Sequence, residues 1–152
     1  MDLAPGKKIY FLSDFHLGAP NIQASRQRED AVVAFLKQAK QDAAAFFIVG
    51  DIFDFWFEYQ KVVPQGFIRL LGKLAIMADK GIKIHIFTGN HDLWINHYLP
   101  NEFNCIVYRN PVITQLNGKT FYIAHGDGLG PGDKGFKFLK SVFTNKFCQS
   151  KL

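Results

Sequence analysis

The sequence predicts an α/β fold in which helices pack on a layered β-sheet. Residues 45–49 and 83–87 form short, almost wholly apolar runs that are typical of buried strands. Residues 26–42 carry apolar side chains at helical spacing, so strand-like and helix-like segments alternate along the chain. This alternation indicates a sheet with packed helices, and in such sheets the chemistry collects beyond the carboxyl ends of the strands.

The first strand and helix are expected at residues 8–12 and 26–42. The apolar residues on the inner face of this helix are Val32, Phe35, Leu36 and Ala39. Residues 45–49 follow as a second strand, and their continuous apolar character predicts that both faces of this strand are covered.

The second helix is expected to begin at Pro64, because proline is favoured at the first position of a helix. Gly81 should end it, since glycine readily adopts the backbone conformation that closes a helix. The side chains expected to point inward are Phe67, Leu71, Leu74 and Ala78. Residues 83–87 then form the third strand.

A short helix over residues 93–99 that ends at Pro100 and a strand at residues 105–108 should come next. An antiparallel hairpin should follow them, because Asn117-Gly118 favours the positive φ angles of a tight turn. Its strands are expected at residues 111–116 and 119–124.

Four polar segments stand where predicted strands end. They are Asp14-Phe15-His16, Gly50-Asp51-Ile52-Phe53-Asp54, Gly89-Asn90-His91-Asp92 and His125-Gly126-Asp127. The first candidate ligands of successive segments are 35 to 39 residues apart, which is about one strand-helix-strand unit, so one rim of the sheet can gather them. A single such residue is usually a turn former. Four together predict a metal centre.

The residue types suit two divalent cations. Cations about 3.5 to 4 Å apart repel each other unless an anion bridges them, and the two oxygens of the Asp51 carboxylate can do so. Asp14 and His16 can face one metal from a turn. Asn90 offers a carbonyl oxygen and His125 an imidazole nitrogen to the other. This mixed set favours manganese, iron or zinc over calcium.

A pair of metals makes water nucleophilic near neutral pH, so the predicted chemistry is hydrolysis of a phosphate ester or pyrophosphate. His91 is the candidate catalytic residue, because it lies next to Asn90 and can donate a proton or hydrogen bond to the phosphate or leaving group. Either Asp54 or Asp92 is expected to orient its ring, and Asp54 is the second candidate catalytic residue. Asn90 and His91 are also candidate substrate contacts.

In this order, Asp-x-His, Gly-Asp-x-x-Asp and Gly-Asn-His-Asp resemble the opening signature of calcineurin-like metallophosphoesterases. Within that superfamily the chain is most similar to UDP-2,3-diacylglucosamine diphosphatases of the lipid A pathway and to their Bacteroidetes-type relatives. The similarity is greatest from residues 50–56 through 125–133 and covers nearly the whole chain.

The resemblance implies a hydrolase that cleaves the pyrophosphate of UDP-2,3-diacylglucosamine, usually with Mn²⁺, and releases UMP and 2,3-diacylglucosamine 1-phosphate. It implies the same ligand roles as the residue types do, with His91 in contact with phosphate. One position departs from the proteobacterial enzymes that define this activity, since they carry Arg where this chain has His91. Another phosphodiesterase or nucleotide pyrophosphatase of the superfamily therefore remains an alternative, and a non-catalytic scaffold is a third.

Two regions are expected, with residues 1–133 as the N-terminal part of the phosphoesterase domain and 134–152 as the start of a helical lid. All of the net charge of +5 lies in the second region, which holds five lysines and no acidic residue. Residues 134–147 read as an amphipathic helix, and Lys137 on its basic side is a candidate substrate contact. This side could meet an anionic substrate or the inner membrane, or be an ordinary solvated face; no nucleic-acid partner is expected.

The family closes its site with a C-terminal Gly-His-x-His segment, and no histidine follows His125. We therefore expect a truncated form that stops before the C-terminal strands and retains metal weakly. The first thirty residues contain no signal peptide and no stretch approaches about eighteen apolar residues, so a cytoplasmic protein, peripheral on the inner membrane, is expected.

Two further features have ordinary interpretations beside functional ones. The aromatic residues between Phe53 and Tyr59 either pack in the core or line an apolar pocket near the site. His85 alternates with Ile84 and Ile86 and is expected to be structural.

Overall fold

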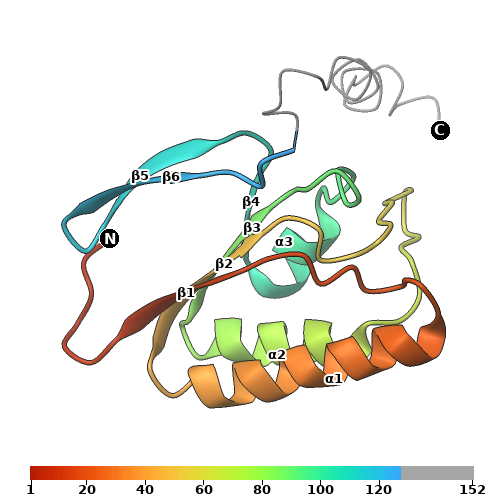
Figure 1. The fold of residues 1–152 in the computed structure, drawn as a ribbon, viewed down its shortest axis with the longest axis horizontal. Coiled ribbons are helices and arrows are strands. Elements are labelled where there is room, and N and C mark those ends of the chain that lie inside the picture. The colour runs from red at the N-terminus through yellow and green to blue at the C-terminus, as the bar shows by residue number, and fades with distance from the viewer. Residues whose placement is uncertain (128–152) are drawn as a thin grey trace.

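A computed structural model describes residues 1–127 and shows a parallel sheet with helices on one face and a hairpin over the other (Figure 1). In sheet order, its strands are β1 (Lys8–Leu12), β2 (Ala43–Val49), β3 (Lys83–Phe87) and β4 (Ile106–Tyr108). The helices are α1 (Ile22–Ala39), α2 (Ile68–Asp79) and the short α3 (Tyr98–Phe103). The hairpin strands β5 (Val112–Leu116) and β6 (Lys119–Ile123) form a separate antiparallel sheet.

Strand β2 lies between two apolar cores, as its composition predicted. Phe46 and Ile48 belong to the core beneath the helices, and both are fully buried. Ala45 and Phe47 point to the opposite face, where they pack with Leu116 of the hairpin. The parallel pairing of β1, β2, β3 and β4 places their carboxyl ends along one rim. The α/β prediction is therefore confirmed.

The strands and the hairpin lie close to their predicted positions, and Asn117 and Gly118 form the hairpin turn with φ angles of 48° and 74°. The boundaries of α1 are shifted toward the N-terminus. The helix begins at Ile22 rather than Arg26 because the Asn21 side chain caps it, accepting a hydrogen bond from the Ala24 amide at 2.9 Å.

The predicted start of the second helix at Pro64 was wrong. Helix α2 begins at Ile68, and its N-cap residue Phe67 has a left-handed φ of 57° and no side-chain cap. The cap comes from another element, since the buried Glu29 carboxylate of α1 accepts hydrogen bonds from the amides of Arg69 and Leu70 at 3.0 and 3.1 Å.

The predicted short helix at residues 93–99 was also wrong, because α3 spans Tyr98–Phe103. Pro100 does not end this helix. It lies in the first turn, where a residue needs no amide hydrogen for the helical ladder. Of the side chains predicted to point inward, Leu74 is buried, and Phe67, Leu71 and Ala78 are partly buried and pack against the same core. Leu70 and Met77 are buried as well.

The predicted lid region 134–152, including the helix at 134–147 and Lys137, lies outside the described residues. Among the helices of residues 1–127, none combines the length and the apolar character needed to cross a membrane.

His85 is a buried histidine on the hairpin side of β3, with only 8% of its surface exposed. Its ring stacks on Phe47 at a centroid distance of 4.3 Å, and its Nδ1 lies 3.0 Å from the Tyr108 hydroxyl. Within residues 1–127, its Nε2 has no hydrogen-bond partner. Burial lowers the pKa of His85, and the positive charge of Lys83 lowers it further.

This lowered pKa predicts a loss of stability at mildly acidic pH. Below the ordinary histidine pKa of about 6.5, the unfolded chain takes up a proton at His85 more readily than the folded chain does, so the free energy of unfolding falls as pH falls through that value. Urea unfolding at about pH 7.5 and about pH 5.5 should show a smaller difference for His85→Phe than for the unsubstituted protein. His97→Gln, at an exposed histidine, is the control and should keep the full difference. Equal pH dependence of all three proteins would contradict the prediction.

Candidate metal centre

The loops that follow β1 and β2 run side by side at the carboxyl rim of the sheet. The Asp14 amide donates to the Gly50 carbonyl at 3.2 Å, and the His16 amide donates to the Asp51 carbonyl at 2.9 Å. The third loop, which follows β3, reaches the same rim, since the His91 amide donates to Asp51 Oδ1 at 3.1 Å. The rule that strand ends gather functional residues therefore describes these loops well.

Three of the predicted ligands have left-handed backbone conformations. The φ angles of Asp14, His16 and Asp51 are 59°, 42° and 53°. A conformation of this kind costs on the order of 1–3 kcal/mol for a residue other than glycine, and it clusters at functional sites. The strain shows that the surrounding contacts impose these turns.

The Asp51 carboxylate lies at the centre of the cluster. Its Oδ2 is 3.6 Å from His16 Nε2 and 3.2 Å from His125 Nε2, so one oxygen faces two imidazoles. Its Oδ1 accepts a hydrogen bond from the His91 amide at 3.1 Å. Only 3% of Asp51 is exposed. A buried carboxylate placed between two imidazoles is a suitable candidate for a ligand shared by two cations.

Potential ligand atoms of Asp14, His16 and Asp51 all lie within 4.8 Å of one another. On the other side of Asp51, His125 Nε2 lies 3.3 Å from the amide oxygen of Asn90. The structure thus brings all five predicted ligands together, in two groups that share Asp51. These oxygen and nitrogen donors fit two divalent transition-metal ions.

Hydrogen bonding fixes the tautomer of His125. A carbonyl oxygen only accepts, so the 2.9 Å contact between His125 Nδ1 and the Val49 carbonyl requires the proton on Nδ1. The Nε2 lone pair is then directed at Asp51 and Asn90, as in a metal ligand. Burial opposes protonation of this ring, but the Val49 carbonyl and the nearby carboxylates raise the pKa of His125 above its ordinary value.

The His91 ring is held by the loop that follows β2, the second loop. Its Nδ1 lies 2.9 Å from the Asp54 carbonyl oxygen and 3.5 Å from Asp54 Oδ1, so Nδ1 again carries the proton. The His16 and His91 rings meet edge to face at 4.8 Å. His91 is exposed at the rim. Of the two residues proposed to orient this ring, Asp54 is the one that contacts it.

Asp92 has a different position from the one expected. It is fully buried, and its Oδ1 accepts from the Gly89 amide at 2.7 Å while its Oδ2 accepts from the Ile52 amide at 2.8 Å. It therefore ties the loop after β2 to the loop after β3. Burial raises the pKa of Asp92 to about 6, although these hydrogen bonds oppose the shift. No local sequence signal indicates this bridging role.

Two glycines leave room for the ligands. A Cβ on Gly89 would lie 2.1 Å from Asp51 Oδ1, and a Cβ on Gly50 would lie 2.3 Å from His125 Nδ1. Gly50 also has a positive φ of 82°. Any side chain at either position would displace a predicted ligand. The Gly-Asp and Gly-Asn pairs of the motifs thus have a direct steric cause.

The segment after the third loop is held by two charged residues that sequence reasoning did not single out. The Arg109 guanidinium donates to the carbonyls of Leu93 and Ile95 at 3.0 and 2.7 Å. The Glu58 carboxylate accepts from the Asn96 amide at 2.8 Å. Each of these contacts joins residues that lie far apart in the chain. Neither Arg109 nor Glu58 belongs to a recognisable motif, so the sequence could not reveal the contacts.

Comparisons with known proteins identify similar chains. Residues 7–146 match the family described as calcineurin-like phosphoesterase. The chain is 45% identical over 120 residues to the UDP-2,3-diacylglucosamine hydrolase of Porphyromonas gingivalis, across 79% of this chain and 46% of that protein. It is 27% identical over 128 residues to the protein of the same name from Nitrosococcus oceani, across 84% of this chain and 49% of that protein. The chain thus spans about half the length of these curated relatives.

A crystal structure of an Aquifex aeolicus protein of unknown function has a similar fold. The TM-score is 0.53 at 18% sequence identity, and the match covers 92% of this chain and 74% of that one. At this identity, the likeness concerns the fold alone.

Proposed function

This chain belongs to the calcineurin-like phosphoesterase family, and on that premise we propose that it carries the two-metal centre of a hydrolase acting on UDP-2,3-diacylglucosamine. The products would be UMP and 2,3-diacylglucosamine 1-phosphate. The proposal of hydrolysis rests on the position of Asp51 Oδ2, which lies between the ring nitrogens of His16 and His125. The names of the relatives support the substrate.

In this proposal Asp14 and His16 hold the first metal, Asn90 and His125 hold the second, and Asp51 holds both. Manganese is the proposed metal, because it accepts both the carboxylate oxygens and the imidazole nitrogens of this set. When bound, such a pair supplies a nucleophilic water near neutral pH and charge that stabilises the phosphoryl oxygens. The protein contributes fixed directions for the donor atoms.

His91 is the proposed contact to the scissile phosphate. Because the Asp54 carbonyl accepts a hydrogen bond from His91 Nδ1, the ring is oriented with Nε2 available to the substrate. A protonated ring donates a hydrogen bond from Nε2 to a phosphate oxygen and can pass that proton to the departing sugar phosphate. Asn90 lies beside it as a second substrate contact, and Lys137, outside the described residues, is proposed as a third.

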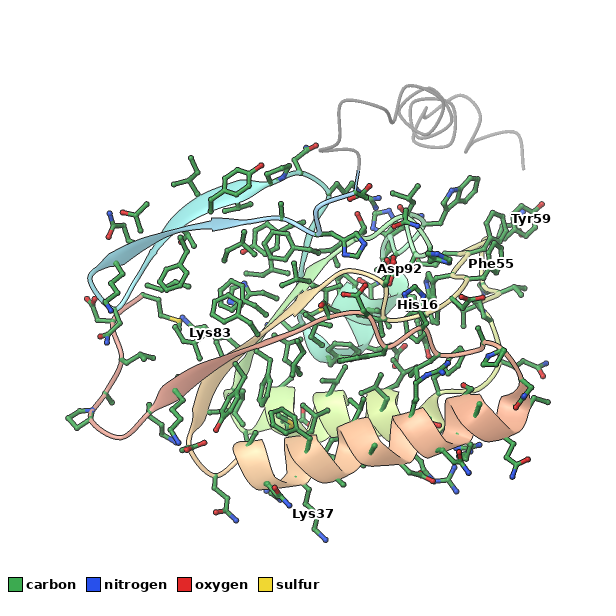
Figure 2. The ribbon with its side chains drawn as sticks, viewed as in Figure 1. His16, Lys37, Phe55, Tyr59, Lys83 and Asp92 are labelled. Carbon is green, nitrogen blue, oxygen red and sulfur yellow. The ribbon has the colours of Figure 1, made fainter. Side chains whose placement is uncertain are left out.

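The aromatic segment beyond the second loop divides into two groups. Phe53 and Trp56 are each 1% exposed and belong to the core. Phe55 and Tyr59 are 67% and 41% exposed, and Figure 2 shows both near the rim that carries His16. We propose that this exposed surface meets the acyl chains of the substrate at the cytoplasmic side of the inner membrane.

Assays of metal-dependent hydrolysis with the whole protein test the proposal. After removal of metal with a chelator, added Mn²⁺ should restore formation of UMP and the acylated sugar phosphate from UDP-2,3-diacylglucosamine, measured by mass spectrometry. Bis(p-nitrophenyl) phosphate and a nucleotide diphosphate ester are the competing substrates. Faster turnover of either one would favour the alternative, a phosphodiesterase or nucleotide pyrophosphatase. The observation that favours this alternative is His91, which stands where the proteobacterial enzymes carry arginine. Manganese binding without turnover of any substrate would favour a scaffold.

A further inference from the structure

Arg28 of α1 binds the backbone of the loop that carries the first two predicted ligands. Its Nε donates to the Phe15 carbonyl at 3.0 Å, and its Nη2 donates to the His16 carbonyl at 2.6 Å. The same Nη2 also donates to the Ala19 carbonyl. Arg28 is half-buried, so its guanidinium is partly withdrawn from water and directed at this one turn.

The turn needs such support because its backbone is strained. Asp14 and His16 are both left-handed, and Phe15 between them is buried with 8% of its surface exposed. The carbonyls of Phe15 and His16 therefore point toward α1, where a cationic donor makes stronger hydrogen bonds than a neutral one. A planar guanidinium serves several carbonyls at once, which a single ammonium does less well.

Other contacts hold the loop in the same position. The Gly18 amide donates to Ser25 Oγ at 2.8 Å, and Ser25 lies one helical turn before Arg28 on the same face of α1. On the opposite side, the His16 amide donates to the Asp51 carbonyl at 2.9 Å. The turn thus lies between α1 and the loop of the predicted shared ligand. From the helix, Arg28 donates to three of its carbonyls and Ser25 accepts from one of its amides.

We propose that Arg28 is a positioning residue for the first metal site. By binding the carbonyls around His16, it sets the backbone that directs the His16 and Asp14 side chains to Asp51. Within residues 1–127 the hydrogen bonds of Arg28 go to backbone carbonyls and not to the predicted donor atoms, so it would act through the turn. This inference rests on the proposed two-metal centre.

Titration of the metal-free full-length protein with Co²⁺ tests the role, because the visible absorption of Co²⁺ reports ligand geometry without any assay of activity. The unsubstituted protein should bind two ions. Arg28→Met should weaken one of them by about tenfold to a hundredfold, the range for loss of a group that supports a ligand, and should change its absorption. Arg28→Lys should recover part of that affinity. Lys37→Met is the control on the same helix, since Lys37 points away from the site (Figure 2), and should match the unsubstituted protein.

Each titration is run at a temperature below the thermal unfolding midpoint measured for that metal-free variant. A folded Arg28→Met protein with a lower midpoint but unchanged Co²⁺ affinities and spectrum would show a merely structural residue and overturn the inference. Where Arg28→Met does not fold, Arg28→Lys decides: weakening at one site supports the role, and equal binding overturns it. Failure of the unsubstituted protein to bind Co²⁺ would instead reject the proposed centre, and the inference with it.

Discussion

Replacing Gly89 with alanine should disrupt the site and destabilise the fold. The new Cβ would lie 2.1 Å from Asp51 Oδ1 and 2.6 Å from the Asp51 backbone nitrogen. Asp51 cannot move aside easily, because it is 3% exposed and its Oδ1 is bound to the His91 amide. We expect a loss of roughly 3 kcal/mol in the free energy of unfolding, at the upper end of the usual range for an overpacked core.

Gly72 provides a matched control in the same protein. It lies within α2, and apart from its own helix backbone a Cβ there would meet no heavy atom of residues 1–127 within 4 Å. Alanine at this position should therefore stabilise the helix by about 0.5–1 kcal/mol. Urea unfolding of both variants in the metal-free state measures the contrast. Equal effects of the two substitutions would show that the space beside Asp51 is not limiting.

Asp51→Asn should abolish hydrolysis while leaving the metal-free fold intact. The asparagine oxygen can still accept from the His91 amide, but the substitution replaces a shared anion with a neutral group beside His16 and His125. Loss of a supporting residue costs roughly 10- to 100-fold in metal affinity, so loss of the shared ligand should cost more than about 100-fold.

Two readouts separate the metal effect from misfolding. Urea unfolding without metal should be close to that of the unsubstituted protein, since the substitution removes a buried negative charge. The rise in unfolding temperature on addition of Mn²⁺ should be lost, together with product formation. Asp79→Asn, at an exposed carboxylate near the end of α2, should keep both. Metal-dependent stabilisation that survives in Asp51→Asn would show that Asp51 is not the shared ligand.

The parts of the fold that depend on neighbouring residues could be predicted from the sequence. The apolar run of β2 indicated a strand covered on both faces, and Asn117-Gly118 indicated the hairpin turn. The start of α2 could not be predicted, because its cap comes from Glu29, about forty positions earlier in the chain. Pro100 misled for a related reason, since its effect depends on its place within α3.

The candidate site shows the same division. The five predicted ligands stand directly after strands, so the topology of the sheet was enough to gather them. The residues that hold their loops were missed, because the role of a buried Asp92 or of Arg28 is defined by backbone groups that only the folded chain brings within reach. Sequence patterns therefore pointed to the candidate donors, and the structure shows the contacts that hold their loops.

His125 lies on a different layer of the molecule from the other predicted ligands, and this position links the hairpin to the parallel sheet. It follows β6 of the hairpin, whereas Asp14, Asp51 and Asn90 follow strands of the parallel sheet. Leu116 and Ile123 of the hairpin pack on the apolar face of the sheet, and the Met1 ammonium, on the segment that leads into β1, donates to the Gln115 carbonyl at 2.8 Å. A metal ion bound by His125 and by residues of the parallel sheet would link the two layers. Movement of the hairpin away from the sheet would release this ion, so retention of the ion would report that the two layers are aligned.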